Sequence, residues 1–387
     1  MIKLSSFFTA FTAWLILLLL SQCQSRPEPS ETTTAAPAPA KKEVSIQLDT
    51  LWVRMGDDDG QRDQKMPHPT SVEKAEFSPD ETRFATVAKG DASVRLWRIN
   101  GDTVWTKYAE AETEAVTFTR DGQYLITGGE DMKIRAWRVE DGEVVKTLND
   151  IASVEGLRKS NDGQRLASGN EAGQIKLWDI SAADPQEWPD QPVHTLVHAP
   201  DQHAPGGKPE EGDADVNQLD WTEDDQQLVS GSRNQEVKLW NVAPDSVPSL
   251  VRTFTGFTGS IKAVRLSPDD SLVAAGAQAS PDGSVRVWRT QTGELVNTLQ
   301  FPNLRIVETV EFTPNGQFLL VGGTEKDSLD NGHLYAFSVA RLLRKGFTPP
   351  AKDIRVFDQE YLYFNRDGNR LLSSHADGSV RLWEVSY

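Results

Sequence analysis

Hydrophobic and polar positions alternate in short runs along nearly the whole chain after residue 43, and seven of these runs end in an aromatic residue. In Ser93-Val94-Arg95-Leu96-Trp97, the valine and leucine share one face of an extended strand, and the arginine and tryptophan share the other. Apolar groups on both faces predict a strand packed between two neighbours. The seven aromatic residues are Trp97, Trp137, Trp178, Trp240, Trp288, Phe337 and Trp383.

A polar turn with recurring chemistry precedes each aromatic residue, as in Ser78-Pro79-Asp80 and Thr119-Arg120-Asp121-Gly122. Proline presets the first turn residue, aspartate bonds the local backbone, and glycine accepts a positive φ. Each turn joins two short alternating strands, and a fourth strand follows most of the aromatic residues. Successive aromatic residues are 40 to 62 residues apart, which indicates a repeat array. The sequence therefore predicts an all-β, seven-bladed propeller with four antiparallel strands per blade.

The repeat resembles the WD-repeat β-propeller family, whose blades end in Trp-Asp. Trp178-Asp179 is the one literal Trp-Asp pair at these positions. In the family, an aspartate lies six residues before the tryptophan and a histidine lies upstream. The resemblance implies a hydrogen-bond network of these three residues, and the first blade alone offers the full set, with His68, Asp91 and Trp97.

The ends of the repeat region predict how the ring closes. The last blade lacks an outer strand after Trp383, whereas residues 44–53 alternate like a strand that has no blade of its own. In the family, the N-terminal strand completes the last blade and leaves only short, protected edges. We therefore expect residues 44–53 to close a propeller that spans residues 44–387.

The first 22 residues have the character of a signal peptide. Lys3 precedes an uncharged apolar stretch at residues 7–20, which is shorter than the ~20 residues of a membrane span. The stretch is followed by Cys23, the only cysteine. This arrangement resembles a bacterial lipoprotein signal, in which the cysteine becomes the lipidated N-terminus. Gln22 departs from that pattern, because the family has a small residue there. Cleavage by the general signal peptidase and an uncleaved anchor are the alternatives.

Residues 23–43 are mostly proline, alanine, threonine, serine and glutamate, which predicts a disordered tether. With a single cysteine, disulfides play no part despite the exported location. The resemblance thus implies a protein exported to the bacterial cell envelope. It would be anchored there by lipid at Cys23, on the periplasmic or surface side, with no other membrane contact.

The formal net charge of −17 argues against nucleic acid as a partner, because nucleic-acid binders present a basic face to phosphate. Solubility alone also explains this charge. Long acidic segments between predicted strands are a candidate rim for a partner with a basic segment, although they are also consistent with solvated loops. The candidate rim residues are Asp57, Asp58, Asp59, Glu210, Glu211 and Asp327.

Other candidate chemistry is weak. Residues 57–60 lack the distal glutamate of a calcium loop. His194, His198 and His203 are interpreted as exposed residues at a blade edge rather than as zinc ligands. Nucleophile motifs such as G-x-S-x-G and H-E-x-x-H are absent from the sequence. The sequence therefore predicts no metal site, no cofactor and no enzymatic activity.

These features together predict a monomeric, non-catalytic scaffold for protein–protein interaction. One alternative is a subunit of an envelope or outer-membrane assembly complex. Another is a ligand-binding or enzymatic propeller, which would require polar residues that converge in the central channel.

Overall fold

The structure is a computed structural model of the 387-residue chain. It describes residues 45–55, 71–198, 214–278, 283–301, 304–325, 332–344, 350–356 and 359–387. The propeller belongs to the compact unit Val44–Tyr387. The predicted signal peptide, Cys23 and the predicted tether lie outside the described residues.

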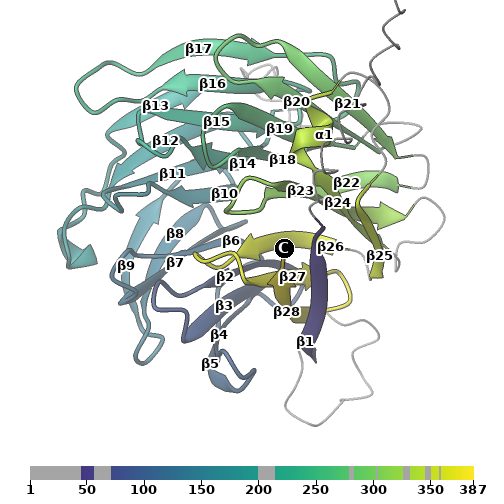
Figure 1. The fold of residues 1–387 in the computed structure, drawn as a ribbon. Coiled ribbons are helices and arrows are strands. Elements are labelled where there is room, and N and C mark those ends of the chain that lie inside the picture. The colour runs from purple at the N-terminus through teal and green to yellow at the C-terminus, as the bar shows by residue number, and fades with distance from the viewer. Residues whose placement is uncertain are drawn as a thin grey trace, which may run out of the picture. The chain divides into compact units, whose positions relative to one another are not determined.

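The described residues form seven four-stranded antiparallel sheets, which confirms the predicted architecture (Figure 1). From the inner strand outward, blade one contains β2 (Val72–Phe77), β3 (Arg83–Ala88), β4 (Ser93–Arg98) and β5 (Thr103–Tyr108). Blade two contains β6 (Thr113–Phe118), β7 (Tyr124–Gly129), β8 (Lys133–Arg138) and β9 (Val144–Asn149). Blade three contains β10 (Val154–Lys159), β11 (Arg165–Asn170), β12 (Gln174–Asp179) and β13 (His194–Val197).

The next three blades and their outer strands follow in chain order. Blade four contains β14 (Val216–Trp221), β15 (Gln227–Ser232), β16 (Val237–Asn241) and β17 (Ser249–Phe254). Blade five contains β18 (Ile261–Leu266), β19 (Leu272–Ala277), β20 (Gly283–Arg289) and β21 (Leu295–Phe301). Blade six contains β22 (Leu304–Phe312), β23 (Phe318–Glu325), β24 (Gly332–Ser338) and β25 (Lys352–Val356). Two short helices, η1 (Pro185–Glu187) and α1 (Val339–Leu342), follow the third strands of blades three and six.

The seventh blade combines both ends of the repeat region. It contains β26 (Gln359–Phe364), β27 (Arg370–His375) and β28 (Ser379–Ser386), and its outer strand is β1 (Gln47–Met55). β1 pairs antiparallel with β28, from Gln47 opposite Ser386 to Met55 opposite Ser379. The inner strands contact one another in sequence around the ring, and β26 contacts β2. The predicted closure by the N-terminal strand is therefore confirmed.

The blade-marking aromatic residues are buried between sheets. Five of the tryptophans each make the same type of hydrogen bond. In each case the indole N–H donates to a hydroxyl on the second strand, at 2.8 to 2.9 Å. Blades five and six have Ala275 and Val321 at the matching register position. Trp288 instead packs against two phenylalanine rings. The acceptors are Thr86 for Trp97, Thr127 for Trp137, Ser168 for Trp178, Ser230 for Trp240 and Ser373 for Trp383.

The predicted turns fold as their residue types require, and three of them also join adjacent blades. At the left-handed turn position, four blades use glycine, whereas Glu81, Asp225 and Asp270 have φ of 55° to 57°. Each of these carboxylates accepts a backbone N–H from the turn of a neighbouring blade. Asp225 is the clearest case, because it binds the amides of Asn161 and Asp162 at 2.7 and 2.8 Å. Charged hydrogen bonds of this kind stabilise the ring where left-handed backbone costs energy.

Gln359 is a buried polar residue at a position that is apolar in most other blades. Val154, Val216, Ile261 and Val307 each pack there against a glycine of the preceding blade, and Gln359 packs in the same way against a glycine of blade six. The Gln359 side chain is fully buried, and its amide has no hydrogen-bond partner within the described structure.

We expect Gln359→Val to stabilise the protein, because it removes a buried polar group that has lost its water without a replacement bond. The gain should be about 1–3 kcal/mol in the free energy of unfolding, measured by chemical denaturation. The reverse change at the matching position of another blade, Val216→Gln, is the control and should destabilise. A Gln359→Val variant that is less stable than the wild type would contradict this interpretation.

Candidate interaction face

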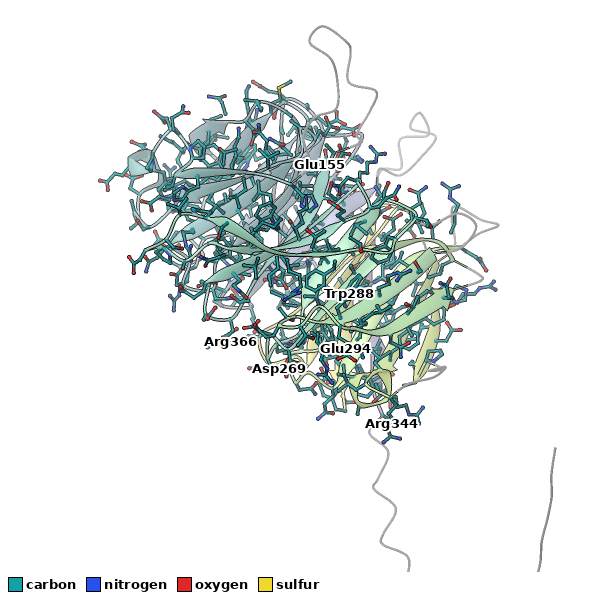
Figure 2. All side chains as sticks on the ribbon, turned by 90° about the horizontal axis from the view of Figure 1, so that it is seen from above. Glu155, Asp269, Trp288, Glu294, Arg344 and Arg366 are labelled. Carbon is teal, nitrogen blue, oxygen red and sulfur yellow. The ribbon has the colours of Figure 1, made fainter. Side chains whose placement is uncertain are left out.

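The ring has two faces that differ in their connections. We call the face where the inner strands begin the loop face, and the face where they end the turn face. Figure 2 shows Glu155, near the start of β10, well apart from Asp269 and Arg366, which belong to turns. The strands that flank residues 56–70 and 199–213 end at the loop face.

The predicted rim residues fall in such segments between strands. The strands on either side of each segment end at the loop face. The residues themselves lie outside the described part of the chain, so their role stays a prediction. They are Asp57, Asp58, Asp59, Glu210, Glu211 and Asp327.

Carboxylates gather at the loop face in the described residues as well. One position near the start of the inner strand carries glutamate in five of the seven blades, and Asn217 and Lys262 occupy it in the other two. A scan of this one repeat position across the blades would have revealed the pattern in the sequence. The five glutamates are Glu73, Glu114, Glu155, Glu308 and Glu360.

Two carboxylates at the loop face have pKa values above their ordinary range. Burial raises the pKa of Glu114 to about 8, and Glu155 and Glu73 add to the rise. Lys89 opposes it through an ion pair with Glu114 at 3.1 Å. Burial likewise raises the pKa of Asp215 to about 7, although this carboxylate pairs with Arg233 at 3.0 Å. Burial is thus the main cause of both rises, and neighbouring carboxylates add to it.

Blade two brings three carboxylates together. Ligand oxygens of Glu112, Glu114 and Glu130 lie within 4.8 Å of one another. Glu112 also accepts the backbone N–H of Gly90 at 3.1 Å. Burial raises the pKa of Glu130, and Glu112 raises it further. Oxygen donors so arranged suit a lysine or arginine side chain, or a hard cation.

We expect the stability of the protein to fall as the pH rises from about 5 to 8. Glu114 and Asp215 have folded-state pKa values raised to about 8 and about 7, above their ordinary values. The folded state therefore holds protons that the unfolded chain has already released, which penalises folding as these groups ionise. Glu114→Gln and Asp215→Asn should flatten the profile of melting temperature against pH. An unchanged slope in the double variant would contradict these pKa values.

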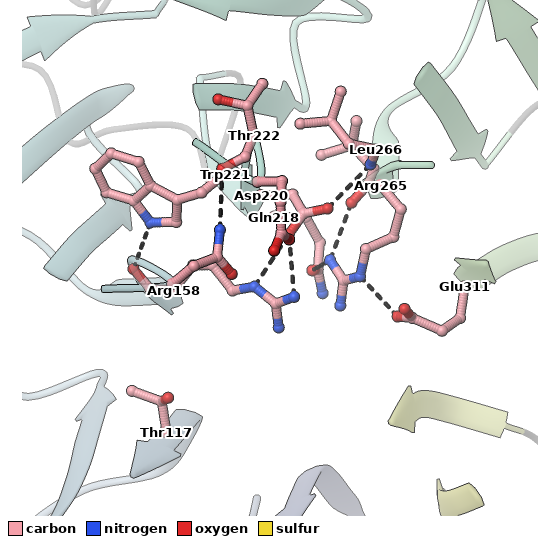
Figure 3. A network of polar contacts seen from close by, with 12 residues as sticks. Thr117, Arg158, Gln218, Asp220, Trp221, Thr222, Arg265, Leu266 and Glu311 are labelled. Carbon is pink, nitrogen blue, oxygen red and sulfur yellow. Dashed lines mark hydrogen bonds and ion pairs between the residues drawn. The ribbon is translucent and has the colours of Figure 1, made fainter. Parts of the chain in front are cut away.

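Polar residues also converge inside the ring, as Figure 3 shows, but they bind one another. The Nε of Arg158 donates to Asp220 at 3.1 Å, and Asp220 also accepts the N–H of Leu266 at 3.0 Å. Arg265 is buried and pairs with Glu311 at 2.7 Å. The hypothesis of a ligand-binding or enzymatic channel requires convergent polar groups that can reach a ligand. These groups connect blades three to six through one another, and Arg158 keeps 27% of its side chain exposed.

The histidines do not all lie as the sequence interpretation expected. His198 is 1% exposed rather than an exposed edge residue. Its Nδ1 lies 2.7 Å from the Ser230 hydroxyl, which also accepts the indole N–H of Trp240 at 2.8 Å. Burial, followed by the charge of Lys238, lowers the pKa of His198 to about 3. The interpretation of His198 was wrong because its ring packs against Trp240 of blade four, with the ring centroids 6.2 Å apart.

Networks that join a histidine, a hydroxyl and a tryptophan occur in blade four, through Ser230, and in blade seven, where the Ser373 hydroxyl lies 2.8 Å from Nε2 of His375 and accepts the indole N–H of Trp383. In blade one, Trp97 donates to Thr86. Asp91 accepts the N–H of Ser93 at 2.9 Å and pairs with Arg95. His68 lies outside the described residues, so its place in the predicted network stays a prediction.

Comparison with known families agrees with the fold. The family model described as WD domain, G-beta repeat, matches residues 142–179, 208–241, 248–289 and 353–384. The model described as anaphase-promoting complex subunit 4 WD40 domain matches residues 75–154. The chain is a WD40-repeat β-propeller protein. The four strands and the buried aromatic residue of each blade are therefore features of a WD40 repeat.

Curated proteins similar to this WD40 propeller match over part of their length. The small ribosomal subunit protein RACK1y of Oryza sativa subsp. japonica is 29% identical over 164 residues, 41% of this chain and 44% of that protein. Eukaryotic translation initiation factor 3 subunit I of Phaeosphaeria nodorum is 30% identical over 146 residues, 35% of this chain and 40% of that protein. The WD repeat-containing protein slp1 of Schizosaccharomyces pombe is 26% identical over 172 residues, 44% and 33% of the two chains.

The alignments thus span less than half the length of each of these three relatives. None of these three relatives is named as an enzyme. In the part of this WD40 propeller that the structure describes, there is no helix with the length and hydropathy needed to cross a bilayer.

Proposed function

We propose that this WD40 propeller is a non-catalytic interaction platform whose loop face binds a basic segment of a protein partner. The observation that carries the proposal is the set of carboxylates at the loop face of blades one to four, where the partly exposed Glu112 and the exposed Glu130 lie beside the buried Glu114. A lysine or arginine placed among them would favour their charged forms and relieve their mutual repulsion.

The rigidity of the ring supports this role. The blades are joined by buried clusters of apolar side chains, by carboxylate contacts between turns and by the charged network inside the ring. Groups that such a frame already holds in place lose little conformational freedom when a partner docks. Charge complementarity then favours a basic partner and a fast association rate.

A charge reversal on each face tests the proposal. A fluorescein-labelled peptide of alternating arginine and lysine serves as the probe, and its binding is measured by fluorescence anisotropy. Glu112→Lys together with Glu130→Lys should weaken binding at least about tenfold and reduce its salt dependence. The control, Glu140→Lys with Glu223→Lys, makes the same charge change at exposed residues of the turn face. Equal losses for both pairs would show non-specific attraction and overturn the proposal.

We also propose that the chain is exported and held in a bacterial cell envelope by a lipid on Cys23. The support is the sequence alone, in which an apolar stretch at residues 7–20 leads to the single cysteine and an extended polar segment.

We expect Cys23→Ala to release the protein from the membrane, because the variant lacks the thiol that would carry the lipid. The measurement is the share of protein in the membrane and soluble fractions of cells that express each form. Cys23→Ser is a matched control for side-chain size and should be released too. Membrane association that survives both substitutions and a high-salt wash would contradict lipidation.

A further inference from the structure

Two exposed apolar side chains stand among the carboxylates of blade two. Met132 is 47% exposed and Ile151 is 62% exposed, and both lie on the loop face. The N–H of Asp150 donates to the carbonyl of Met132 at 2.7 Å, so the two residues lie on adjoining segments. Large apolar groups exposed together on a soluble domain are typical of contact surfaces.

Ile151 is held in place by a buried carboxylate. Asp150 accepts the N–H of Ile151 at 2.6 Å, the side-chain amide of Asn170 at 2.7 Å and the ammonium of Lys176 at 2.6 Å. Since Asn170 and Lys176 belong to blade three, the segment that carries Ile151 is fixed to two blades. An apolar side chain presented on a fixed segment loses little freedom when it is covered.

Met132 occupies a turn position that favours other residue types. Its φ is 63°, and the matching residues of four other blades are Ala92, Gly173, Gln235 and Gly378, also at positive φ. Glycine adopts this conformation without the steric cost that a side chain incurs. Blade two therefore carries a long thioether side chain at a cost to its own stability, and half of that side chain faces solvent.

Carboxylates lie near Met132 and Ile151 on the loop face. The backbone N–H of Glu130, two residues before Met132, donates to the carbonyl of Glu112 at 3.0 Å, and the carboxylates of both residues belong to the acidic group of blade two. Glu155 lies at the start of the next inner strand and accepts the hydroxyl of Ser153 at 2.9 Å. An apolar contact flanked by carboxylates complements a segment with an apolar side chain between basic ones.

From this geometry we infer that Met132 and Ile151 form an apolar contact site for one aliphatic side chain of a partner protein, with lysine or arginine on either side of it in the partner sequence. Glu112 and Glu130 pair with those flanking charges. The inference rests on the proposed basic-segment function and adds the anchor that gives it sequence selectivity, since charge alone does not distinguish one basic segment from another.

The test uses three fluorescein-labelled peptides of the form Gly-Arg-Lys-X-Lys-Arg-Gly, where X is leucine, methionine or serine. On the wild-type protein, the leucine and methionine peptides should bind about fivefold more tightly than the serine peptide, because an apolar side chain is removed from water. Ile151→Ser should remove this preference, so that the three peptides bind this variant equally. Val247→Ser, at a residue that is 84% exposed, is the matched control and should keep the preference.

Met132→Gly separates binding from folding. The substitution should raise the melting temperature, because glycine accepts the left-handed conformation, and it should also weaken the leucine peptide several-fold. A purely structural role for Met132 would not reduce binding in a more stable variant.

The possible outcomes separate this inference from the function on which it rests. Equal binding of all three peptides, still sensitive to Glu112→Lys and Glu130→Lys, would overturn the apolar site and leave the proposed function intact. Absence of salt-sensitive binding for every peptide would overturn both.

Discussion

Removal of residues 45–55 should lower the melting temperature by about 10 °C, on the order of 5 kcal/mol in the free energy of unfolding. The segment supplies the outer strand of blade seven, and its pairing with β28 extends over most of that strand. Ile46 and Leu48 are buried in the cluster that contains Trp383 and Leu371. The deletion removes this apolar burial together with the ladder of backbone hydrogen bonds.

The same deletion uncovers β28 as an edge strand, which favours pairing with a second molecule. Light scattering after thermal unfolding should therefore show more aggregation than in the wild type. Asp49→Ala, at an exposed residue of the same strand, is the control and should leave the melting temperature nearly unchanged. A deletion variant with the same melting temperature as the wild type would show that β1 does not hold the ring closed.

Arg265→Ala should destabilise the protein by about 3–5 kcal/mol, because it leaves the largely buried Glu311 carboxylate without its partner. The Arg265 guanidinium donates to Glu311 at 2.7 Å, to Gln218 at 2.9 Å and to the Tyr361 hydroxyl at 2.5 Å. These contacts reach the blades on both sides of blade five and one beyond them. The effect should therefore appear as loss of cooperative stability of the whole ring, measured by chemical denaturation.

A double substitution identifies the source of that loss. Arg265→Ala with Glu311→Ala should be less destabilising than the two single changes added together, because no charge is left unpaired. Burial already raises the pKa of Glu311, and loss of the arginine should raise it further. The cost of Arg265→Ala should thus be smaller at low pH, where Glu311 is protonated in both states, and should grow as the pH rises. Strict additivity at every pH would contradict the assignment.

The repeat pattern predicted the architecture because it depends on local chemistry. A turn such as Thr119-Arg120-Asp121-Gly122 forms from its own residues, and the Asp121 carboxylate accepts its own turn's hydroxyl at 2.7 Å. Alternation of Ile46 and Leu48 likewise predicted a buried strand face. The left-handed backbone of Asp225 and its carboxylate contact were not predicted, because the contact with Asn161 joins turns from separate blades.

The candidate site was harder to predict for the same reason. Acidic segments between strands suggested an acidic face, but the glutamates that lie together on the inner strands are separated by whole repeats in sequence. His198 was misjudged because it packs against Ser230 and Trp240 of blade four, which are distant from it in sequence. Met132 looks unremarkable until its φ of 63° and its exposure are seen together.

Crosslinking mass spectrometry in intact cells tests most directly whether the loop face is the partner-binding surface. The experiment compares the wild-type protein with the Glu112→Lys, Glu130→Lys variant. We expect a recurrent protein partner linked to Lys65, Lys208 or Lys326, which lie in segments whose flanking strands end at the loop face. The variant should lose that partner while it remains folded. A partner that links only to lysines of the outer strands, or that the variant retains in full, would contradict a loop-face platform.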